Sequence, residues 1–376
     1  MVDLGQIARA TGDEYLRARA TTPFQRRALR DIQRCRTEAM GSVYAVCDGC
    51  GAEHLQFRSC QNRSCPRCQS TARQAWLEAR QQELLPVPYF HVVFTVPEAL
   101  NPIALYCPEF FYAALLRAAG KAVLDVGKQK LHVQLGCMAV LHTWGQNLSL
   151  HPHAHCVVPG GGLSEDGNRW VALRKNSYLL PVKVLASRFR TLLCQAVRGA
   201  IKGGQLERVP NEIAVSAIRK ASKQDWVVYV KPPFGGAGQV LEYVSRYTHR
   251  IAISNHRILS FTDHRVTFRW RDYADGNRQK VMALDAIEFL RRFLMHVLPD
   301  RFVRIRYYGF LTSSKRRKNI TLARVLLGSA CAPERRVRPV RRVLCPNCYA
   351  LKLARGRRDA ERTAGRLRSP PVPEAA

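Results

Sequence analysis

Apolar runs of strand length alternate along the chain with stretches of helical periodicity, and prolines and glycines separate them. Residues 89–96 read Tyr-Phe-His-Val-Val-Phe-Thr-Val and stop at Pro97, which is the composition of a strand. Further strands are predicted over 137–144, 153–159, 225–231, 250–254, 257–262 and 266–270. Helices are predicted over 1–34, 70–85, 101–127, 183–202, 239–247 and 283–297. This mixture, with its tight turns, favours an α+β fold over a regular βαβ series.

The length of 376 residues and two shifts in composition predict three regions. An N-terminal region over 1–86 holds most of the closely spaced cysteines and ends where two prolines stop a helix. The strands and helices of 87–312 form the second region, and 313–376 is a basic, partly disordered tail.

The charge balance points to a polyanionic partner. Sixty Lys and Arg residues against 28 Asp and Glu give a net charge of +32, so DNA or RNA is the first partner to expect. An anionic membrane could also offset this charge, but no apolar run approaches the roughly 18 residues of a spanning helix. The N-terminal residues also lack the pattern of a secretory signal.

The cysteines predict metal binding. Six of the 13 cysteines lie within 34 residues, and an odd total with Cys-x-x-Cys pairs favours metal over disulfides in a reducing, cytoplasmic compartment. Two such pairs present four thiolates, the tetrahedral set that Zn²⁺ prefers. The predicted structural zinc ligands are Cys47, Cys50, Cys65 and Cys68.

Several neighbouring residues are surplus to one zinc site. Cys35, Cys60 and His54 could be alternative ligands, members of a second site or ordinary side chains. Cys345 and Cys348 supply two of the four ligands of a zinc site. Cys331 could be a third, but no fourth ligand is evident. Arginines of this region suit phosphate contact or a solvated surface, and the two taken as DNA-binding candidates are Arg63 and Arg67.

Three histidines alternate with other residues at 151, 153 and 155. Side chains two apart on a strand share a face, so His151, His153 and His155 are expected to point the same way and to hold one divalent cation. A strand edge with ordinary histidines is the alternative.

Downstream, Tyr243 and Tyr247 are four residues apart on a predicted helix, and so neighbours on one face. Such a pair usually packs in a core, but a metal that polarises a phosphate makes a phenol an effective nucleophile. Arg246 and Arg250 could hold phosphates or cover the surface. Aromatic residues that could stack on bases, if they are not core, include Trp144, Tyr229 and Trp270.

Together these motifs resemble the rolling-circle HUH transposases of the IS ninety-one type. The likeness rests on the cysteine motif at 59–69, the strand at 89–97, Leu150-His-Pro-His-Ala-His-Cys156, Tyr243-Val-Ser-Arg-Tyr-Thr-His-Arg250 and the segment 291–299. It covers roughly residues 25–315. The resemblance implies a small N-terminal zinc-binding domain followed by an HUH-endonuclease-like antiparallel sheet with packed helices. It also implies a tyrosine that attacks DNA, forming a 5′-phosphotyrosine and freeing a 3′-OH.

The resemblance assigns roles to individual residues. His153 and His155 match the two histidines that hold a catalytic Mg²⁺ or Mn²⁺, and Tyr243 and Tyr247 match the tyrosines of two-tyrosine members. Some relatives work with one tyrosine, so that choice stays open. The third metal ligand also stays open among His151, His142, Gln239 and Glu242. Ser64 stands where a histidine is expected, which favours an all-cysteine zinc site.

The predicted function is that of a transposase that nicks and rejoins single-stranded or hairpin DNA at the ends of a mobile element. No phosphate-binding GxxxxGK[ST] loop occurs, which suits a phosphotyrosine link that rejoins without ATP. A rolling-circle replication initiator or a relaxase would use the same site. A zinc-dependent DNA-binding protein without catalysis is the alternative from another class.

Overall fold

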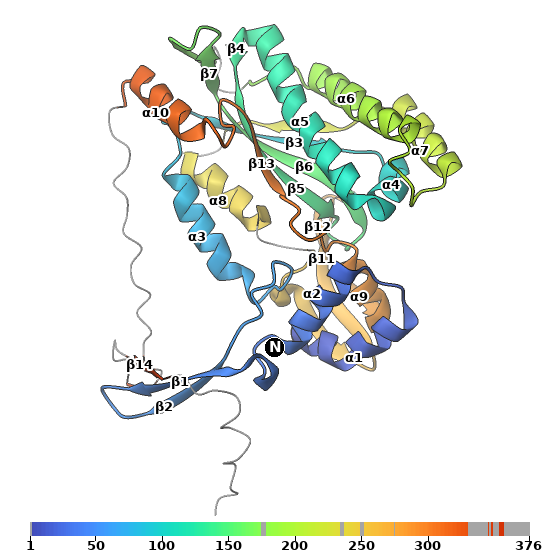
Figure 1. Cartoon of the computed structure of the whole chain (residues 1–376), viewed down its shortest axis with the longest axis vertical. Helices are drawn as coiled ribbons and strands as arrows, with labels where there is room; N and C mark the ends of the chain where they lie inside the picture. The colour runs from blue at the N-terminus through green and yellow to red at the C-terminus, as the bar shows by residue number, and fades with distance from the viewer. Residues whose placement is uncertain are drawn as a thin grey trace, which may run out of the picture.

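A five-stranded antiparallel sheet with the order β13-β5-β6-β3-β9 lies at the centre of the computed structural model (Figure 1). Its strands are β3 (Tyr89–Thr95), β5 (Gly136–Trp144), β6 (Leu150–Pro159), β9 (Val228–Lys231) and β13 (Ile305–Gly309). The structure describes residues 2–173, 178–233, 237–248, 252–273, 275–329, 345, 347–348 and 353–356. The predicted α+β class with an antiparallel sheet is confirmed.

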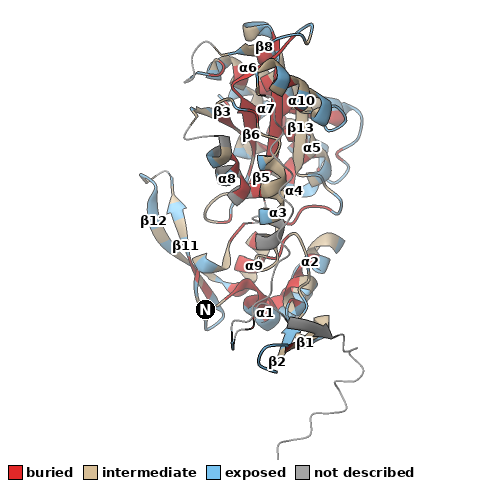
Figure 2. Ribbon diagram, turned by 90° about the vertical axis from the view of Figure 1, so that its left-hand side faces the viewer, coloured by how far each residue is buried: buried red, intermediate tan, exposed pale blue. Residues whose placement is uncertain are grey.

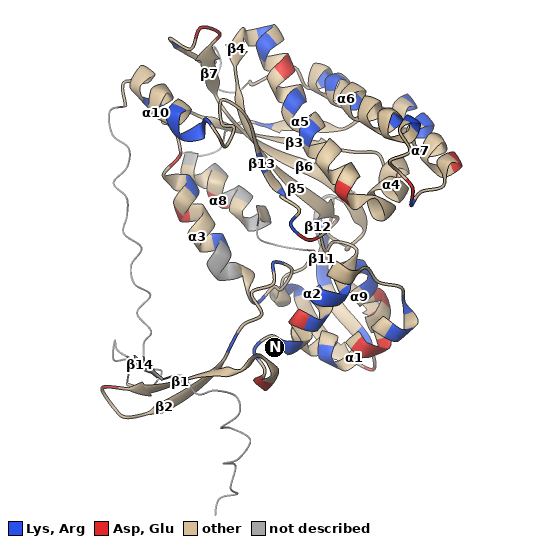
Figure 3. Cartoon of the chain, in the orientation of Figure 1, with Lys and Arg blue, Asp and Glu red and all other residues tan. Residues whose placement is uncertain are grey.

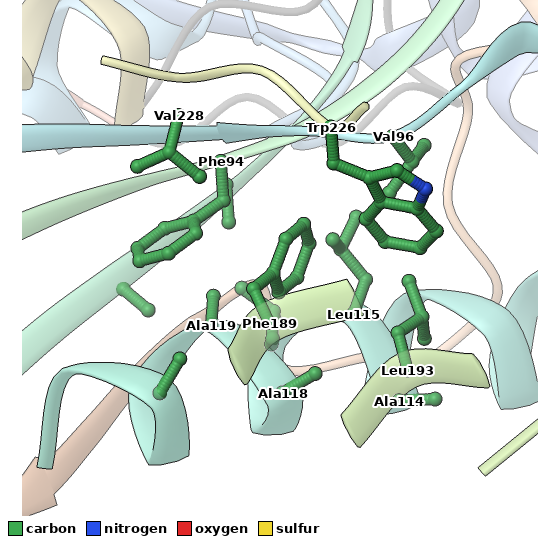
Figure 4. Packing of buried hydrophobic residues seen from close by; sticks show 14 of the residues in the cluster. Phe94, Val96, Ala114, Leu115, Ala118, Ala119, Phe189, Leu193, Trp226 and Val228 are labelled. Atoms are coloured by element: carbon green, nitrogen blue, oxygen red, sulfur yellow. The ribbon is translucent and has the colours of Figure 1, made fainter. Parts of the chain in front are cut away.

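One face of this sheet is covered by α4 (Asn101–Tyr106), α5 (Pro108–Leu131), α6 (Val182–Lys202) and α7 (Asn211–Lys223). Alternate residues of β3, such as Phe90 and Phe94, are fully buried here because side chains two apart on a strand share a face. Phe189 of α6 lies between Phe94 and Trp226, with ring centroids 4.9 and 5.1 Å away (Figure 4). This large core fixes the sheet rigidly from one side.

The opposite face is covered by α3 (Gln69–Gln81) and α8 (Ala237–Thr248), which also pack on each other. Leu241 of α8 and Leu77 of α3 are buried against Met138, Val140 and Val157 of the sheet. This second core is smaller than the first, and the face continues from it toward the histidines of β5 and β6.

A second unit joins the N-terminus to a later part of the chain. It consists of α1 (Leu4–Ala18), α2 (Pro23–Arg34), the sheet β10 (Ile258–Thr262), β11 (Arg265–Asp272) and β12 (Arg278–Asp285), and α9 (Ala286–Leu294). Their apolar faces share one core, in which Ile7, Ile32, Phe268 and Phe293 are all buried. The hairpin of β11 and β12 projects from this unit (Figure 2). The cysteine-rich N-terminal segment therefore packs on residues some 250 positions later in the sequence.

Local signals set the helix ends in this unit. The side chains of Asp3 and Thr22 each accept a hydrogen bond from the backbone N–H three residues on. The side chains of Gln6 and Gln25 in turn accept one from the backbone N–H of Asp3 and Thr22. These two capping boxes satisfy the backbone donors at the starts of α1 and α2. The side chain of Asp285 caps α9 by accepting hydrogen bonds from the backbone N–H groups of residues 287 and 288.

The remaining elements are peripheral. A hairpin of β1 (Ser42–Cys47) and β2 (Glu53–Phe57) is extended by β14 (Leu353–Gly356). The short strands β4 (Val133–Gln134), β7 (Gly161–Ser164) and β8 (Trp170–Ala172) form a small sheet. Three short 3₁₀ turns are η1 (Glu38–Met40), η2 (Glu98–Leu100) and η3 (Asn255–Arg257), and α10 (Arg316–Leu326) follows β13.

The structure differs from several predicted elements. The helix predicted over 101–127 divides at Cys107, because Pro108 cannot continue the preceding helix and instead begins the next one. Of the strand predicted over 250–254, residues 252–254 are described and form no strand, since Ala252 has a positive φ of 53°. The predicted basic tail contains α10, whose Ile320 and Ala323 pack against Leu85 and Phe310.

Candidate metal centres

Three histidines meet on the sheet face that α3 and α8 cover. His142 of β5 lies directly opposite His153 of β6 in the strand register, and His155 is two residues further along β6 on the same face. One ring nitrogen from each lies within 4.8 Å of the others. The antiparallel pairing of two strands therefore brings His142 to two histidines that lie 11 and 13 positions later in the sequence.

Neighbouring groups orient two of these rings. His153 Nδ1 lies 2.6 Å from the backbone carbonyl of His151, which makes this nitrogen the N–H donor. His155 Nδ1 lies 2.7 Å from Nε2 of His91 on β3. A hydrogen bond at Nδ1 leaves Nε2 as the ligand atom, so both contacts suit a metal held through Nε2.

Burial also sets the charge state of the cluster. It lowers the pKa of His153 to about 4 and the pKa of His155 well below its ordinary value. Both rings are therefore neutral at pH 7. A neutral imidazole has the lone pair that binds a metal ion, so these two ligands do not have to release protons first.

The third member of the cluster is His142, not His151. The register of β5 and β6 shifts between the pairs His142–His153 and Trp144–Leu150, so His151 lies within this irregularity, and its side chain is exposed. His151 remains near the cluster, with its ring centroid 5.2 Å from that of His153. Of the candidates for the third ligand, the structure thus brings His142 together with His153 and His155, and leaves His151 beside this cluster.

Helix α8 carries Tyr243 and Tyr247 over the same sheet face. Its Leu241 packs on Val140, the residue opposite His155, and Ser245 Oγ accepts a hydrogen bond of 3.1 Å from Arg73 Nε of α3. The backbone of both tyrosines is described, whereas their side chains and that of Arg246 lie outside the described residues, as does all of Arg250. Fold and register therefore place the tyrosine helix and the histidine strands on one side of the sheet.

A four-cysteine cluster lies where α2, α3 and the β1–β2 hairpin meet. It consists of Cys35, Cys60, Cys65 and Cys68. Cys68 Sγ lies 3.6 Å from the sulfurs of both Cys35 and Cys60, and Cys65 Sγ lies 3.7 Å from Cys35 Sγ. Four thiolates at about 2.3 Å from a tetrahedral Zn²⁺ would be about 3.8 Å apart, so this spacing fits zinc.

The expected grouping of Cys47 and Cys50 with Cys65 and Cys68 is not the one that the structure forms. Cys47 and Cys50 lie at the turn of the β1–β2 hairpin, whereas Cys65 and Cys68 follow its open end. Five paired residues on each strand separate the two ends by four intervals of about 3.4 Å, or about 14 Å. Cys47 and Cys50 instead cluster with Cys345 and Cys348, and the surplus Cys35 and Cys60 complete the first site.

Two arginines that suited phosphate contact have structural partners. Arg63 donates hydrogen bonds to the carbonyl oxygens of Phe302 at 2.8 Å and Leu298 at 3.0 Å, and also to that of Pro299. Arg67 forms an ion pair with Asp3, the N-cap of α1. Both guanidinium groups therefore join the cysteine segment to other parts of the fold, a role that the sequence pattern did not reveal.

Comparison with known proteins agrees with this architecture. Residues 136–319 match a family described as "Putative transposase", and residues 7–96 match a "Transposase zinc-binding domain". The chain is 48% identical over 337 residues to the putative transposase y4qJ of Sinorhizobium fredii, covering 87% of this chain and 84% of that protein. It is 28% identical over 307 residues to the transposase for insertion sequence element IS801 of Pseudomonas savastanoi pv. phaseolicola, covering 76% and 72%.

No solved structure matches the chain with statistical significance. Within the described residues, no helix combines the length and the apolar character needed to cross a membrane.

Proposed function

Because the chain belongs to the transposase family of the IS ninety-one type, we propose that it nicks and rejoins single-stranded DNA at the ends of a mobile element through a phosphotyrosine intermediate. The observation that carries this proposal is the common sheet face of the three histidines and α8. A histidine cluster and a helix with two tyrosines on one face are the parts that a tyrosine transesterase needs.

In the proposed first step, the phenolic oxygen of Tyr243 or Tyr247 attacks the phosphorus of the scissile phosphodiester. The phenol gives up its proton to water as the tyrosine O–P bond forms, the bond to the 3′ oxygen breaks, and that oxygen takes up a proton to become a 3′-OH. In rejoining, a 3′-OH attacks the phosphotyrosine and the tyrosine leaves. One phosphoester bond replaces another in each step, so the reaction needs no ATP.

His142, His153 and His155 would hold the catalytic Mg²⁺ or Mn²⁺ of this proposal. When bound, such an ion polarises a phosphoryl oxygen and offsets the charge that develops on it. Three imidazoles are softer ligands than these ions usually prefer, but they leave positions open for phosphate oxygens and water. The hydrogen bonds at Nδ1 of His153 and His155 keep both rings in place before DNA binds.

Basic residues supply the proposed contact with DNA. Lys and Arg residues are distributed over both units and outnumber acidic residues (Figure 3). Arg269 and Arg271 are exposed on β11, Arg278 on β12, and Tyr273 beside them is 67% exposed. Arginines that contact phosphates beside an aromatic ring that can stack on a base suit single-stranded DNA. Arg246 and Arg250 are the proposed phosphate contacts beside the tyrosines.

The test is a nicking assay on 5′- and 3′-labelled single-stranded DNA that carries the element's own ends, with Mg²⁺ or Mn²⁺. Covalent protein–DNA adduct is scored on a denaturing gel for the wild type, Tyr243→Phe, Tyr247→Phe and the double variant. Adduct formation that is lost in the double variant supports the proposal, and the single variants tell whether one tyrosine or two is used.

The matched control is His153→Ala/His155→Ala, which should bind DNA normally and form no adduct. An adduct that persists in the double tyrosine variant would contradict the proposed nucleophile. Tight DNA binding without any adduct in the wild type would favour the non-catalytic DNA-binding alternative.

A further inference from the structure

We propose that Cys47, Cys50, Cys345 and Cys348 form a second zinc site, which joins the C-terminal part of the chain to the N-terminal hairpin. Cys345 and Cys348 lie outside the residues that match either transposase family model. One ligand atom from each of the four residues lies within 4.8 Å of the others.

The sulfur spacing distinguishes this cluster from a pair of disulfides. Cys47 Sγ lies 3.5 Å from Cys348 Sγ, and Cys50 Sγ lies 3.7 Å from Cys345 Sγ. Bonded sulfurs are about 2.05 Å apart, whereas thiolates around one tetrahedral Zn²⁺ are about 3.8 Å apart. Both contacts also join the two Cys-x-x-Cys pairs, because each sulfur of one pair lies close to a sulfur of the other. Four thiolates that converge in this way match a closed structural zinc site.

The first pair of ligands sits on a tight turn. Cys47 ends β1, and its N–H donates to the carbonyl of Ala52, while Gly51 N–H donates back to the carbonyl of Cys47. Gly51 has a φ of +68°, which residues other than glycine rarely adopt, and this lets the chain reverse directly after Cys50. Cys345-Pro-Asn-Cys348 supplies the second pair with the same spacing.

Backbone pairing brings the two parts of the chain together independently of the sulfurs. Strand β14 pairs antiparallel with β1, so that Cys47 lies opposite Leu353 and Tyr44 opposite Gly356. With β2 on the other side, β1 becomes the central strand of a three-stranded sheet. Two Cys-x-x-Cys turns at one end of such a sheet are the arrangement of a Cys₄ zinc ribbon.

A histidine next to the cluster supports thiolate ligands. His54 of β2 has its Nε2 3.2 Å from Cys345 Sγ. An imidazole N–H that donates to a metal-bound thiolate offsets part of the negative charge that four thiolates bring to one Zn²⁺. We therefore assign His54 to the outer shell of the site rather than to its ligands.

The hairpin needs such a site because it has almost no core. Of residues 42–57, Cys47 alone is buried, and Leu55 is 55% exposed. A two-stranded hairpin without a packed face is marginal in water, and small elements of this kind are usually stabilised by a metal or a disulfide. Zinc held by residues 295 and 301 positions apart would order the hairpin and retain the C-terminal strand beside it.

The experiment counts zinc in the full-length protein by mass spectrometry after removal of loosely bound metal. Two zinc ions per chain are expected in the wild type, and one in both Cys345→Ser/Cys348→Ser and Cys47→Ser/Cys50→Ser. Cys107→Ser, which changes a cysteine of neither cluster, should retain two. One zinc in the wild type, or two in the Cys345→Ser/Cys348→Ser variant, would overturn the proposal.

A measurement on the unaltered protein covers the case in which the double variants do not fold. Cysteine alkylation is followed peptide by peptide while a chelator is titrated. Cys47, Cys50, Cys345 and Cys348 should be protected in the zinc-loaded protein and should become reactive together. Alkylation of Cys345 and Cys348 before any zinc is released would overturn the site without requiring a variant.

Discussion

His91 Nε2 lies 2.7 Å from His155 Nδ1, and the planes of the two rings are parallel to within 1°. The two residues come from neighbouring strands, β3 and β6, and both are buried. If His155 binds a cation through Nε2, its Nδ1 carries the proton and donates a hydrogen bond to Nε2 of His91. His91 then sets the tautomer and orientation of a ligand without touching the metal ion.

Removal of this acceptor should weaken metal binding more than it weakens the fold. His91→Phe is expected to lower Mn²⁺ affinity by about 10–100-fold, the usual effect of losing an outer-shell partner. His91→Gln keeps an acceptor and should recover part of that loss. Mn²⁺ titration followed by electron paramagnetic resonance measures the affinity, and thermal melting shows whether each variant folds. Equal affinities in the wild type and in folded His91→Phe would exclude the orienting role.

Substitution of His142 and of His151 should affect metal binding and adduct formation very differently. His142→Ala should cost more than the roughly 10–100-fold of an outer-shell change, in both Mn²⁺ affinity and adduct formation. His151→Ala should leave adduct formation within a few-fold of the wild type, because His151 is exposed and outside the cluster. The reverse order of effects would restore His151 as the third ligand and would mean that the strand register changes when metal binds.

Arg63 should stabilise the fold rather than contact DNA. Its guanidinium donates to the carbonyls of Leu298, Pro299 and Phe302, and each lost charged donor costs about 1–3 kcal/mol. Arg63→Ala is therefore expected to lower the free energy of unfolding by about 3 kcal/mol. Arg30→Gln, on the exposed side of α2, should change it by less than about 0.5 kcal/mol.

The salt dependence of DNA binding tests whether Arg63 also contacts a phosphate. The slope of log K against log salt should be the same for Arg63→Ala and the wild type. A slope smaller by about 0.7, the contribution of one phosphate contact with single-stranded DNA, would show a direct phosphate contact instead.

Loss of arginines from the β11–β12 hairpin should reduce the salt slope, because these residues are proposed to contact phosphates directly. Arg269→Gln/Arg271→Gln removes two exposed charges from β11 and should reduce the salt slope for single-stranded DNA by about 1.4, since each phosphate contact contributes about 0.7. Both positions are solvent-facing, so unfolding should be little changed. Arg117→Gln/Arg219→Gln, on the helices of the other sheet face, is the matched control. Identical slopes in the two double variants would remove the hairpin from the DNA-binding surface.

Local pattern predicted much of the central sheet, because its strands are continuous β-branched and aromatic runs between prolines and glycines. The predicted strand over 89–96 corresponds to β3, and the predicted helix over 183–202 corresponds to α6. Ala154, which lies between His153 and His155 on β6, is fully buried in the core on the opposite face of the sheet. These features depend on the alternation of side chains along one element, which the sequence shows directly.

Pairings between distant elements could not be read in this way. His142 joins His153 through the register of two strands, and Cys345 joins Cys50 across 295 residues. The spacing of Cys-x-x-Cys pairs shows that each pair belongs to a metal site, but not which pairs share an ion. That choice depends on the length of the β1–β2 hairpin, which places Cys47 and Cys65 at opposite ends. The same limit hid the partners of Arg63.

His296 should make the protein lose stability as the pH falls below 6.5. It is 1% exposed, its Nε2–H donates to the carbonyl of Leu148, and its Nδ1 accepts from the hydroxyl of Thr143, each at 3.2 Å. Burial lowers the pKa of His296 to about 4. The unfolded chain, with a histidine pKa near 6.5, therefore binds a proton that the folded chain does not bind between pH 6.5 and 4.

Stability associated with this residue is thus complete above pH 6.5 and declines as the pH falls toward 4, by up to about 3 kcal/mol. His296→Asn is expected to be less stable at pH 7.5 and to have a flatter dependence of unfolding free energy on pH between 6.5 and 4. His91 and His153 titrate in the same window, so the difference between variant and wild type isolates His296. His264→Asn, at an exposed turn with a positive φ that asparagine tolerates, is the control, and its curve should run parallel to that of the wild type. Parallel curves for His296→Asn as well would show that the buried imidazole is protonated in the folded protein.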